Sequence, residues 1–149
     1  MLIRVGEGED ALMDRAGLSD DILVEPGVQL LRAGHLRARS LATPPGCRLE
    51  ALSLHAGQVN LGGDTRVEGV VMAGFLDCHA ALRCAGLRLG GSGVIEGDLT
   101  LTGGDLQAGG NLVIHGTLRA ARAPRGAGRL FCNDYRIAEN DCPVSHPGV

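Results

Sequence analysis

The chain lacks lysine and tryptophan, and its only aromatic residues are Phe75, Phe131 and Tyr135 among 149 residues. Without lysine, a Schiff base, a P-loop lysine and a lysine general base are all excluded. Aromatic side chains bury the largest areas in most cores, so this interior must be built from Leu, Val, Ile, Ala and Cys instead. The length is that of one domain with a core of its own.

The chain also lacks a strong excess of charge of either sign. The net charge is −3 at pH 7, which gives no overall basic character for binding nucleic acid. Acidic residues dominate residues 1–25, whereas four arginines and no acid lie between Arg119 and Arg129. We interpret these as two solvated ends; the alternative is head-to-tail attraction between copies.

Long apolar runs are absent as well. The start, MLIRVGEGED, becomes acidic by residue 7, and no run approaches the ~20 residues of a membrane span. We therefore expect no transmembrane segment and a cytoplasmic protein. The cysteines are odd in number and irregularly spaced, which is not typical of a disulfide framework. They are Cys47, Cys78, Cys84, Cys132 and Cys142.

Glycine is abundant, with 24 residues, and it marks a six-residue repeat. The blocks GGDLQA, GGNLVI and HGTLRA place Leu106, Leu112 and Leu118 six residues apart, and GDLTLT and AGLRLG precede them. Apolar residues alternate within each block, which predicts short strands with one buried face. Glycines at the block boundaries suit sharp corners, because glycine permits positive φ and close backbone approach.

Strands joined by tight corners predict an all-β fold, a single-stranded β-solenoid (β-helix) of about five turns with roughly six-residue strands. Three blocks make a turn of about 18 residues, and successive turns stack about 4.8 Å apart. This period aligns Leu76, Val94 and Leu112 as one inward ladder. It also aligns Leu82 and Leu118 as the ends of a second ladder, whose middle position, one turn from each, falls at Thr100. The handedness of the coil is left open.

The repeat divides the chain into three parts. Residues 1–27 are predicted to be an acidic N-terminal cap segment, in which residues 9–16 are a candidate for a short helix. Residues 28–132 form the solenoid, and residues 133–149 an irregular C-terminal tail. The end turns of a solenoid expose unpaired backbone groups that template further pairing unless something covers them.

The blocks GDLTLT, GGDLQA, GGNLVI and HGTLRA resemble those of the bactofilins, the polymer-forming bacterial cytoskeletal proteins. This resemblance covers most of residues 28–132. It implies a non-enzymatic scaffold whose solenoids join end to end and recruit protein partners.

Three other resemblances remain open. Residues 61–72, LGGDTRVEGVVM, are similar to the hexapeptide repeat of left-handed β-helix acyltransferases. GGDLQAGGNLVIHGTL is similar to repeats of secreted filamentous haemagglutinins, and the GGDL-type blocks resemble those of leucine-rich bacterial effectors.

An acyltransferase would need a histidine as general base beside a cleft. The candidates are His35, His55, His79, His115 and His146. His79 and His115 stand at block boundaries, where we expect exposed corner side chains. Cys78 precedes His79 directly, so in a strand the two side chains point to opposite faces, which disfavours a catalytic pair.

A zinc site formed by Cys78, His79, Cys84 and Cys47 lacks the usual zinc-knuckle spacing. Because Cys78 and Cys84 are six residues apart, we expect both to fill the core on successive faces. Pairing of Cys132 with Cys142 is left open. We therefore predict no catalytic, cofactor-binding or metal-binding residue, and no cofactor.

Charged side chains are expected on the outer faces, either as a solvated surface or as a docking surface for proteins. They are Asp64, Arg66, Glu68, Arg83, Arg88, Asp98, Asp105, Arg119 and Arg122. The sequence predicts a non-enzymatic scaffold or polymer subunit with end-to-end self-association and a protein partner. The alternatives are a monomeric interaction module, such as the partner of an effector or toxin, and, more weakly, an acyltransferase.

Overall fold

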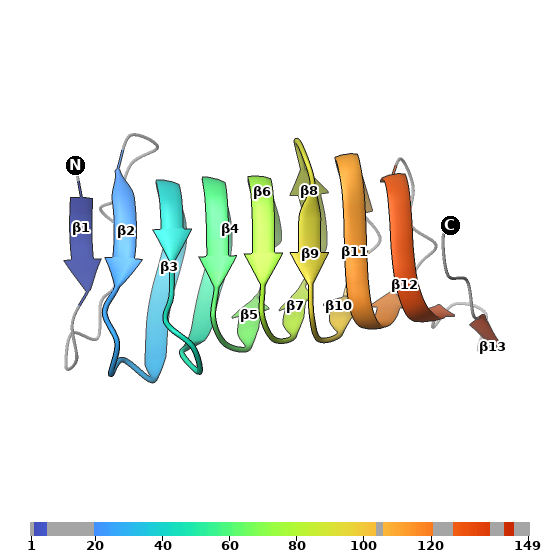
Figure 1. Cartoon of the computed structure of the whole chain (residues 1–149), viewed down its shortest axis with the longest axis horizontal. Coiled ribbons are helices and arrows are strands. Elements are labelled where there is room, and N and C mark those ends of the chain that lie inside the picture. Colours follow the sequence, from blue (N-terminus) through green and yellow to red (C-terminus); the bar gives the residue numbers. More distant parts are fainter. Residues whose placement is uncertain (1, 6–19, 104–105, 121–126, 138–141, 145–149) are drawn as a thin grey trace.

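The computed structural model describes residues 2–5, 20–103, 106–120, 127–137 and 142–144. These residues form one parallel sheet wound into a β-solenoid of about six turns, with the N-terminal strand at one end and the C-terminal strands at the other (Figure 1). The described part of the chain contains strands and no helix. The candidate cap helix, residues 9–16, lies outside it.

The strands differ widely in length because some continue around a corner. They are β1 (Leu2–Val5), β2 (Asp21–Val24), β3 (Leu30–Ala42), β4 (Arg48–Leu61), β5 (Thr65–Val67), β6 (Val70–Cys78), β7 (Leu82–Cys84), β8 (Gly86–Leu89), β9 (Gly93–Ile95), β10 (Leu99–Leu101), β11 (Leu106–Ala120), β12 (Ala127–Ile137) and β13 (Cys142–Val144). Each six-residue repeat contains a paired segment and a corner. The paired segment on any one side of the coil is therefore shorter than six residues.

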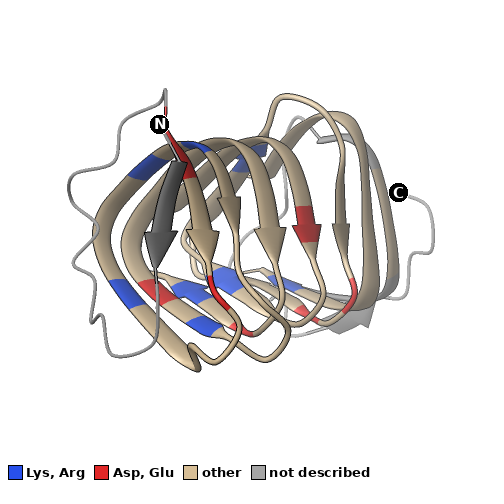
Figure 2. Cartoon of the chain, turned by 60° about the vertical axis from the view of Figure 1, so that its left-hand side comes forward, with Lys and Arg blue, Asp and Glu red and all other residues tan. Residues whose placement is uncertain are grey.

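The coil has three sides, visible in the view of Figure 2. Side A consists of β1, β2, residues 40–42 of β3, 58–61 of β4 and 75–78 of β6, β9, and residues 112–114 of β11 and 129–132 of β12. Side B consists of residues 30–33 of β3, 48–51 of β4, β5, β7, β10, and residues 118–120 of β11 and 134–137 of β12. Side C consists of residues 35–38 of β3, 53–56 of β4, 70–73 of β6, β8 and residues 106–108 of β11. Each strand segment on a side is called a rung.

Aliphatic columns fill the interior, as the alternation within the blocks predicts. On side A one inward column runs through seven rungs, all of them buried: Ile22, Leu41, Val59, Leu76, Gly93, Leu112 and Leu130. Neighbouring rungs lie about 4.8 Å apart, so each side chain packs on its copies in the adjacent turns. This column is one side of a core whose residues are almost all aliphatic.

The predicted alignment of Leu76, Val94 and Leu112 is wrong at its middle member. Gly93 is in register with both leucines, and Val94 faces outward and is only partly buried. The two steps are 17 residues (76 to 93) and 19 residues (93 to 112), so a constant period of 18 is correct only over two turns. Leu99 likewise takes the inward place between Leu82 and Leu118.

Neighbouring leucines occupy the space at Gly93. A Cβ on this glycine would lie 2.7 Å from Leu89 Cδ1 and 3.2 Å from Leu112 Cδ1. The methyl groups of two other rungs therefore take the place of a side chain there. This is why the inward column passes through a residue that the apolar pattern does not mark.

The corner glycines are required by stacking along the axis. A Cβ on Gly109 would lie 2.2 Å from Gly90 O, and one on Gly103 would lie 2.5 Å from Ala85 O. Such contacts with backbone of the preceding turn leave no room for a side chain. Positive φ occurs instead at Gly27 and Gly46, outside the clear repeat blocks.

The strand ladder extends beyond residues 28–132 at both ends. β1 pairs with β2, and β2 pairs with β3, before the repeat becomes visible in the sequence. β12 continues as a regular strand to Ile137, so residues 133–137 are not irregular. β13 then pairs antiparallel with the end of β12 on side B. These additional rungs account for the extra turn.

Candidate functional site

The cysteines whose side chains are described line the core. Cys47, Cys78, Cys84 and Cys132 are buried. Burial raises the pKa of the Cys78 thiol to about 11 and that of Cys84 to about 12. Both lie fully buried in the hydrophobic core, which confirms the core-filling prediction for Cys78 and Cys84, and a thiol that stays protonated is a poor nucleophile and a poor metal ligand. The question of pairing between Cys132 and Cys142 stays open, because the side chain of Cys142 is not described.

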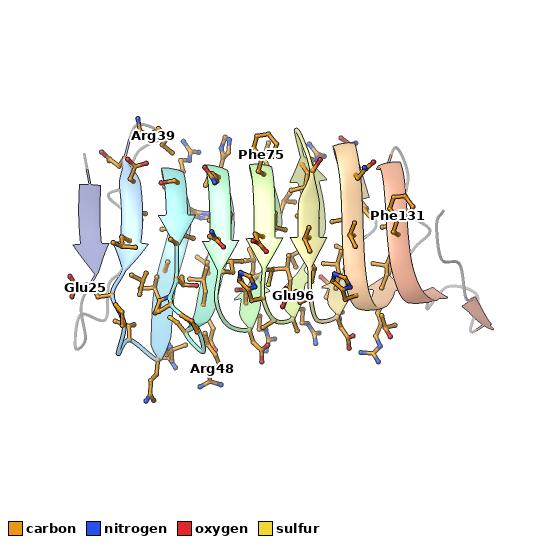
Figure 3. All side chains as sticks on the ribbon, viewed as in Figure 1. Glu25, Arg39, Arg48, Phe75, Glu96 and Phe131 are labelled. Atoms are coloured by element: carbon orange, nitrogen blue, oxygen red, sulfur yellow. The ribbon has the colours of Figure 1, made fainter. Side chains whose placement is uncertain are left out.

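His79 stands at the corner that follows side A, as predicted for a boundary residue. Its Nε2 lies 3.6 Å from Asp77 Oδ2, and its Nδ1 lies 3.5 Å from Glu96 Oε1 in the next turn. Figure 3 labels Glu96 at this corner. All three side chains are about half exposed, whereas Cys78 is buried on the opposite face. The predicted separation of Cys78 from His79 is confirmed.

The other histidines do not converge on one site. His35 Nδ1 lies 2.8 Å from Ser53 Oγ, and His55 lies on the neighbouring rung of side C, in register with Arg37. His115 is exposed, and His146 lies outside the described residues. Within the described ranges, no group of three or more His, Cys, Asp or Glu side chains is arranged to hold a metal ion.

Two surface grooves cross several rungs of the described coil, and a third, of about 450 Å³, lies at the turns that contain Gly27 and Gly46. One of about 520 Å³ follows the corner between sides C and A, over a column of small residues that includes Gly57, Gly74 and Gly90, and it is flanked by Arg39 and Arg88. The other, of about 390 Å³, lies on side B among charged side chains. The first groove takes its shape from the corner glycines, and the second from outward arginines.

The second groove follows a straight column of outward positions on side B. Register places Arg32, Glu50, Arg66, Arg83, Thr100 and Arg119 on successive rungs. We call these six residues the arginine column; basic positions recur along the lower part of the coil in Figure 2. Arg48 stands beside the column, and Figure 3 shows its side chain directed away from the coil.

The two ends of the arginine column are neutralised within the chain. Arg32 Nε lies 3.5 Å from Glu50 Oε2, and Arg119 Nη1 lies 3.3 Å from Asp98 Oδ2. Neither Arg66 nor Arg83, in the middle of the column, forms an ion pair within the part of the chain that the structure describes. The centre of the column is therefore the basic part of side B.

Most of the outward charged residues predicted from sequence are exposed. This holds for Asp64, Arg66, Glu68, Arg83, Arg88 and Arg119, whereas Asp98 is half-buried. Asp105 and Arg122 lie outside the described residues. The column itself was missed, because its spacing varies from 16 residues (Glu50 to Arg66) to 19 (Thr100 to Arg119). The short motifs TRV, LRC and LTL, each an outward residue between two buried ones, are the signal that identifies its rungs.

The two ends of the coil are the remaining candidate surfaces. On side A, among the described residues, no strand pairs with the outer edge of β1 or with the outer edge of residues 129–132 of β12. On side B, β13 covers the end of β12 through register pairs of Tyr135 with Val144 and Ile137 with Cys142. The C-terminal end is thus open on one side and covered on another.

The described ranges contain no helix that is long and apolar enough to span a membrane. Comparisons with known proteins found no matching family model, no matching curated protein and no matching solved structure. The features of this chain that bear on its function are therefore the strand edges at the two ends of the coil and the side chains on its outer faces.

Proposed function

We propose that this protein is a non-enzymatic structural subunit that associates end to end, with the C-terminal rung of one copy pairing with β1 of the next. The observation that carries the proposal is the pair of parallel strand edges on side A, one at each end, that no other described strand covers. An exposed strand edge is a template for another strand. The resemblance of the repeat blocks to bactofilins supports the same kind of assembly, and a cytoplasmic location stays a prediction.

Register supports a continuous joint. Backbone register aligns Ile3 with Ile22, the first member of the buried column that ends at Leu130. It likewise aligns Arg4 with Leu23, at the start of the neighbouring outward column that ends at Phe131. Stacking a second copy by one strand spacing would place an apolar residue over an apolar residue inside the coil. It would also give the unpaired backbone groups of both end rungs hydrogen-bond partners.

A charge on the last rung tests this joint. Phe131 is 41% exposed on the last rung of side A, and Phe75 is 60% exposed on a middle rung; Figure 3 labels both. In the joint, Phe131→Lys places a cation beside Arg4 of the next copy, at a cost of roughly 0.2–1 kcal/mol for like charges on paired positions, in addition to the loss of the ring. Phe75→Lys adds the same charge away from either end.

Light scattering and negative-stain microscopy measure the outcome. We expect the unmodified chain and Phe75→Lys to form particles that lengthen with concentration, and Phe131→Lys to form shorter ones. A monomer for the unmodified chain at every concentration would refute the proposal. Equal lengths for the two variants would show that the joint is not at this edge.

The cover on side B favours a second candidate, a monomeric interaction module. β13 is short, antiparallel and contains Pro143, and such features protect an edge from further pairing. In this case the long sides of the coil are the binding surfaces. The same scattering measurement distinguishes the two candidates.

A further inference from the structure

The middle of the arginine column contains a pair of cations that the chain does not neutralise. Arg66 and Arg83 occupy paired outward positions on β5 and β7, so their backbones are about one strand spacing, ~4.8 Å, apart. Like charges on directly paired positions destabilise a sheet. Both side chains are exposed and line the 390 Å³ groove of side B.

Among the described residues, no nearby acid forms an ion pair with Arg66 or Arg83; Glu50, which is in register with Arg66, is paired with Arg32. One Asp64 carboxylate oxygen, Oδ1, accepts a hydrogen bond from the Ala81 backbone N–H at 3.1 Å. Asp98 is engaged with the Thr117 backbone N–H at 2.8 Å and with Arg119. Each end of the column thus has its own carboxylate, while the two central guanidinium groups present their donors to the groove.

The chemistry of side B selects among anionic partners. Glu50, Asp64 and Asp98 flank the central pair, so the groove offers discrete cationic positions and not the continuous basic face that a nucleic-acid backbone requires. Side B carries no Phe or Trp on its described rungs, and Tyr135 is in register with the inward Leu118, not with the arginine column, so no column of aromatic rings for base stacking follows the groove. Of the exposed large apolar residues, Leu23, Phe75 and Phe131 lie on side A and Met72 on side C, whereas Leu52 lies at the corner between sides B and C. None of the five lies on a rung of side B, so that face lacks a row of anchors for a lipid surface.

We propose that the centre of side B binds an acidic segment of a partner protein, with carboxylates of that segment bound by Arg66 and Arg83. Guanidinium groups bind carboxylates through two parallel hydrogen bonds, which suits discrete side-chain carboxylates. Arg48, exposed beside the column and lining the same groove, extends the basic surface toward the N-terminal end. This surface is on the flank of the coil, so binding does not require end-to-end assembly.

The test uses the full chain and a fluorescein-labelled peptide of alternating Glu and Ser, with anisotropy measured at low ionic strength. We expect Arg66→Ala combined with Arg83→Ala to weaken binding by at least about tenfold, because charge-assisted hydrogen bonds are lost. Arg66→Lys with Arg83→Lys retains the charge but not the paired geometry, and should lose affinity severalfold. Circular dichroism checks that each variant is folded.

The matched control is Arg37→Ala combined with Arg88→Ala. It removes the same charge from exposed outward positions on side C, and it should change affinity by no more than about twofold. Equal weakening by the two alanine pairs, or no binding of the peptide, would refute the proposal. Tighter binding of oligothymidylate or of phosphatidylglycerol vesicles through Arg66 and Arg83 would also overturn it, because the partner would then not be a protein.

Discussion

Replacing Gly109 with alanine tests whether axial close packing shapes this coil. The new Cβ would lie 2.2 Å from the backbone oxygen of Gly90, whereas real Cβ atoms are essentially never closer than 3.0 Å to such an atom. The two turns would have to separate by about 0.8 Å, the difference between these distances, at this corner. That movement stretches the adjacent hydrogen bond from Gly110 N–H to Gly91 O, now 2.8 Å.

The expected cost is about 1–3 kcal/mol, the usual range for overpacking. Gly90→Ala, one turn earlier at the same corner, is the matched control, since its Cβ would be 3.8 Å from the nearest atom. That substitution should leave stability unchanged or raise it by about 0.4–1 kcal/mol, because alanine restricts the unfolded chain.

Urea and thermal unfolding followed by circular dichroism measure both variants. Each kcal/mol corresponds to about 2–4 °C in Tm for a domain of this size. We expect a lower Tm for Gly109→Ala and an unchanged or higher Tm for Gly90→Ala. Equal stability of the two variants would refute the argument that glycine is required by contact with the preceding turn.

Three further predictions concern the core, the acid stability and the thiols. Leu112→Asp should unfold the coil, since it places an unpaired charge at a fully buried position; a native circular dichroism spectrum would show that the inward assignment is wrong. Hydrogen bonds from Arg39 and Ser40 lower the pKa of Asp21 from 3.8 to about 2. The stability that this carboxylate contributes is therefore complete above pH 3.8 and is lost as the pH falls toward 2, so Arg39→Ala should be less stable than the unmodified chain at pH 5 and equal to it at pH 2. Cys84, with its pKa raised by burial to about 12, should not react with a thiol reagent at pH 8 until the chain is unfolded in urea; rapid labelling of the native protein would contradict its placement in the core.

The fold class can be predicted from the sequence because strand alternation and corner glycines are local signals. Leu106, Leu112 and Leu118 are all buried, as the six-residue spacing indicates, on three successive sides of the coil. The register between turns is not local, since a corner can gain or lose a residue without changing the alternation on the adjoining strands. Val94 was therefore assigned inward, although Gly93 has that place.

The candidate surfaces depend on the same register and are harder to predict. Arg66, Arg83 and Arg119 can each be recognised as outward from their apolar neighbours. Their alignment with Arg32 and Glu50 becomes evident only when the varying turn lengths are known. The cover provided by β13 is also invisible in the sequence, because three residues that include Pro143 show no strand pattern.

Cross-linking across the proposed joint tests the assembly most directly. In the proposed joint, Phe131 of one copy would lie beside Arg4 of the next, one strand spacing or ~4.8 Å away, within the Cα separation that a disulfide tolerates. A chain carrying both Arg4→Cys and Phe131→Cys should give a ladder of multimers on a non-reducing gel after mild oxidation. The same ladder from Arg4→Cys with Phe75→Cys, or no ladder from either chain, would contradict end-to-end assembly through side A.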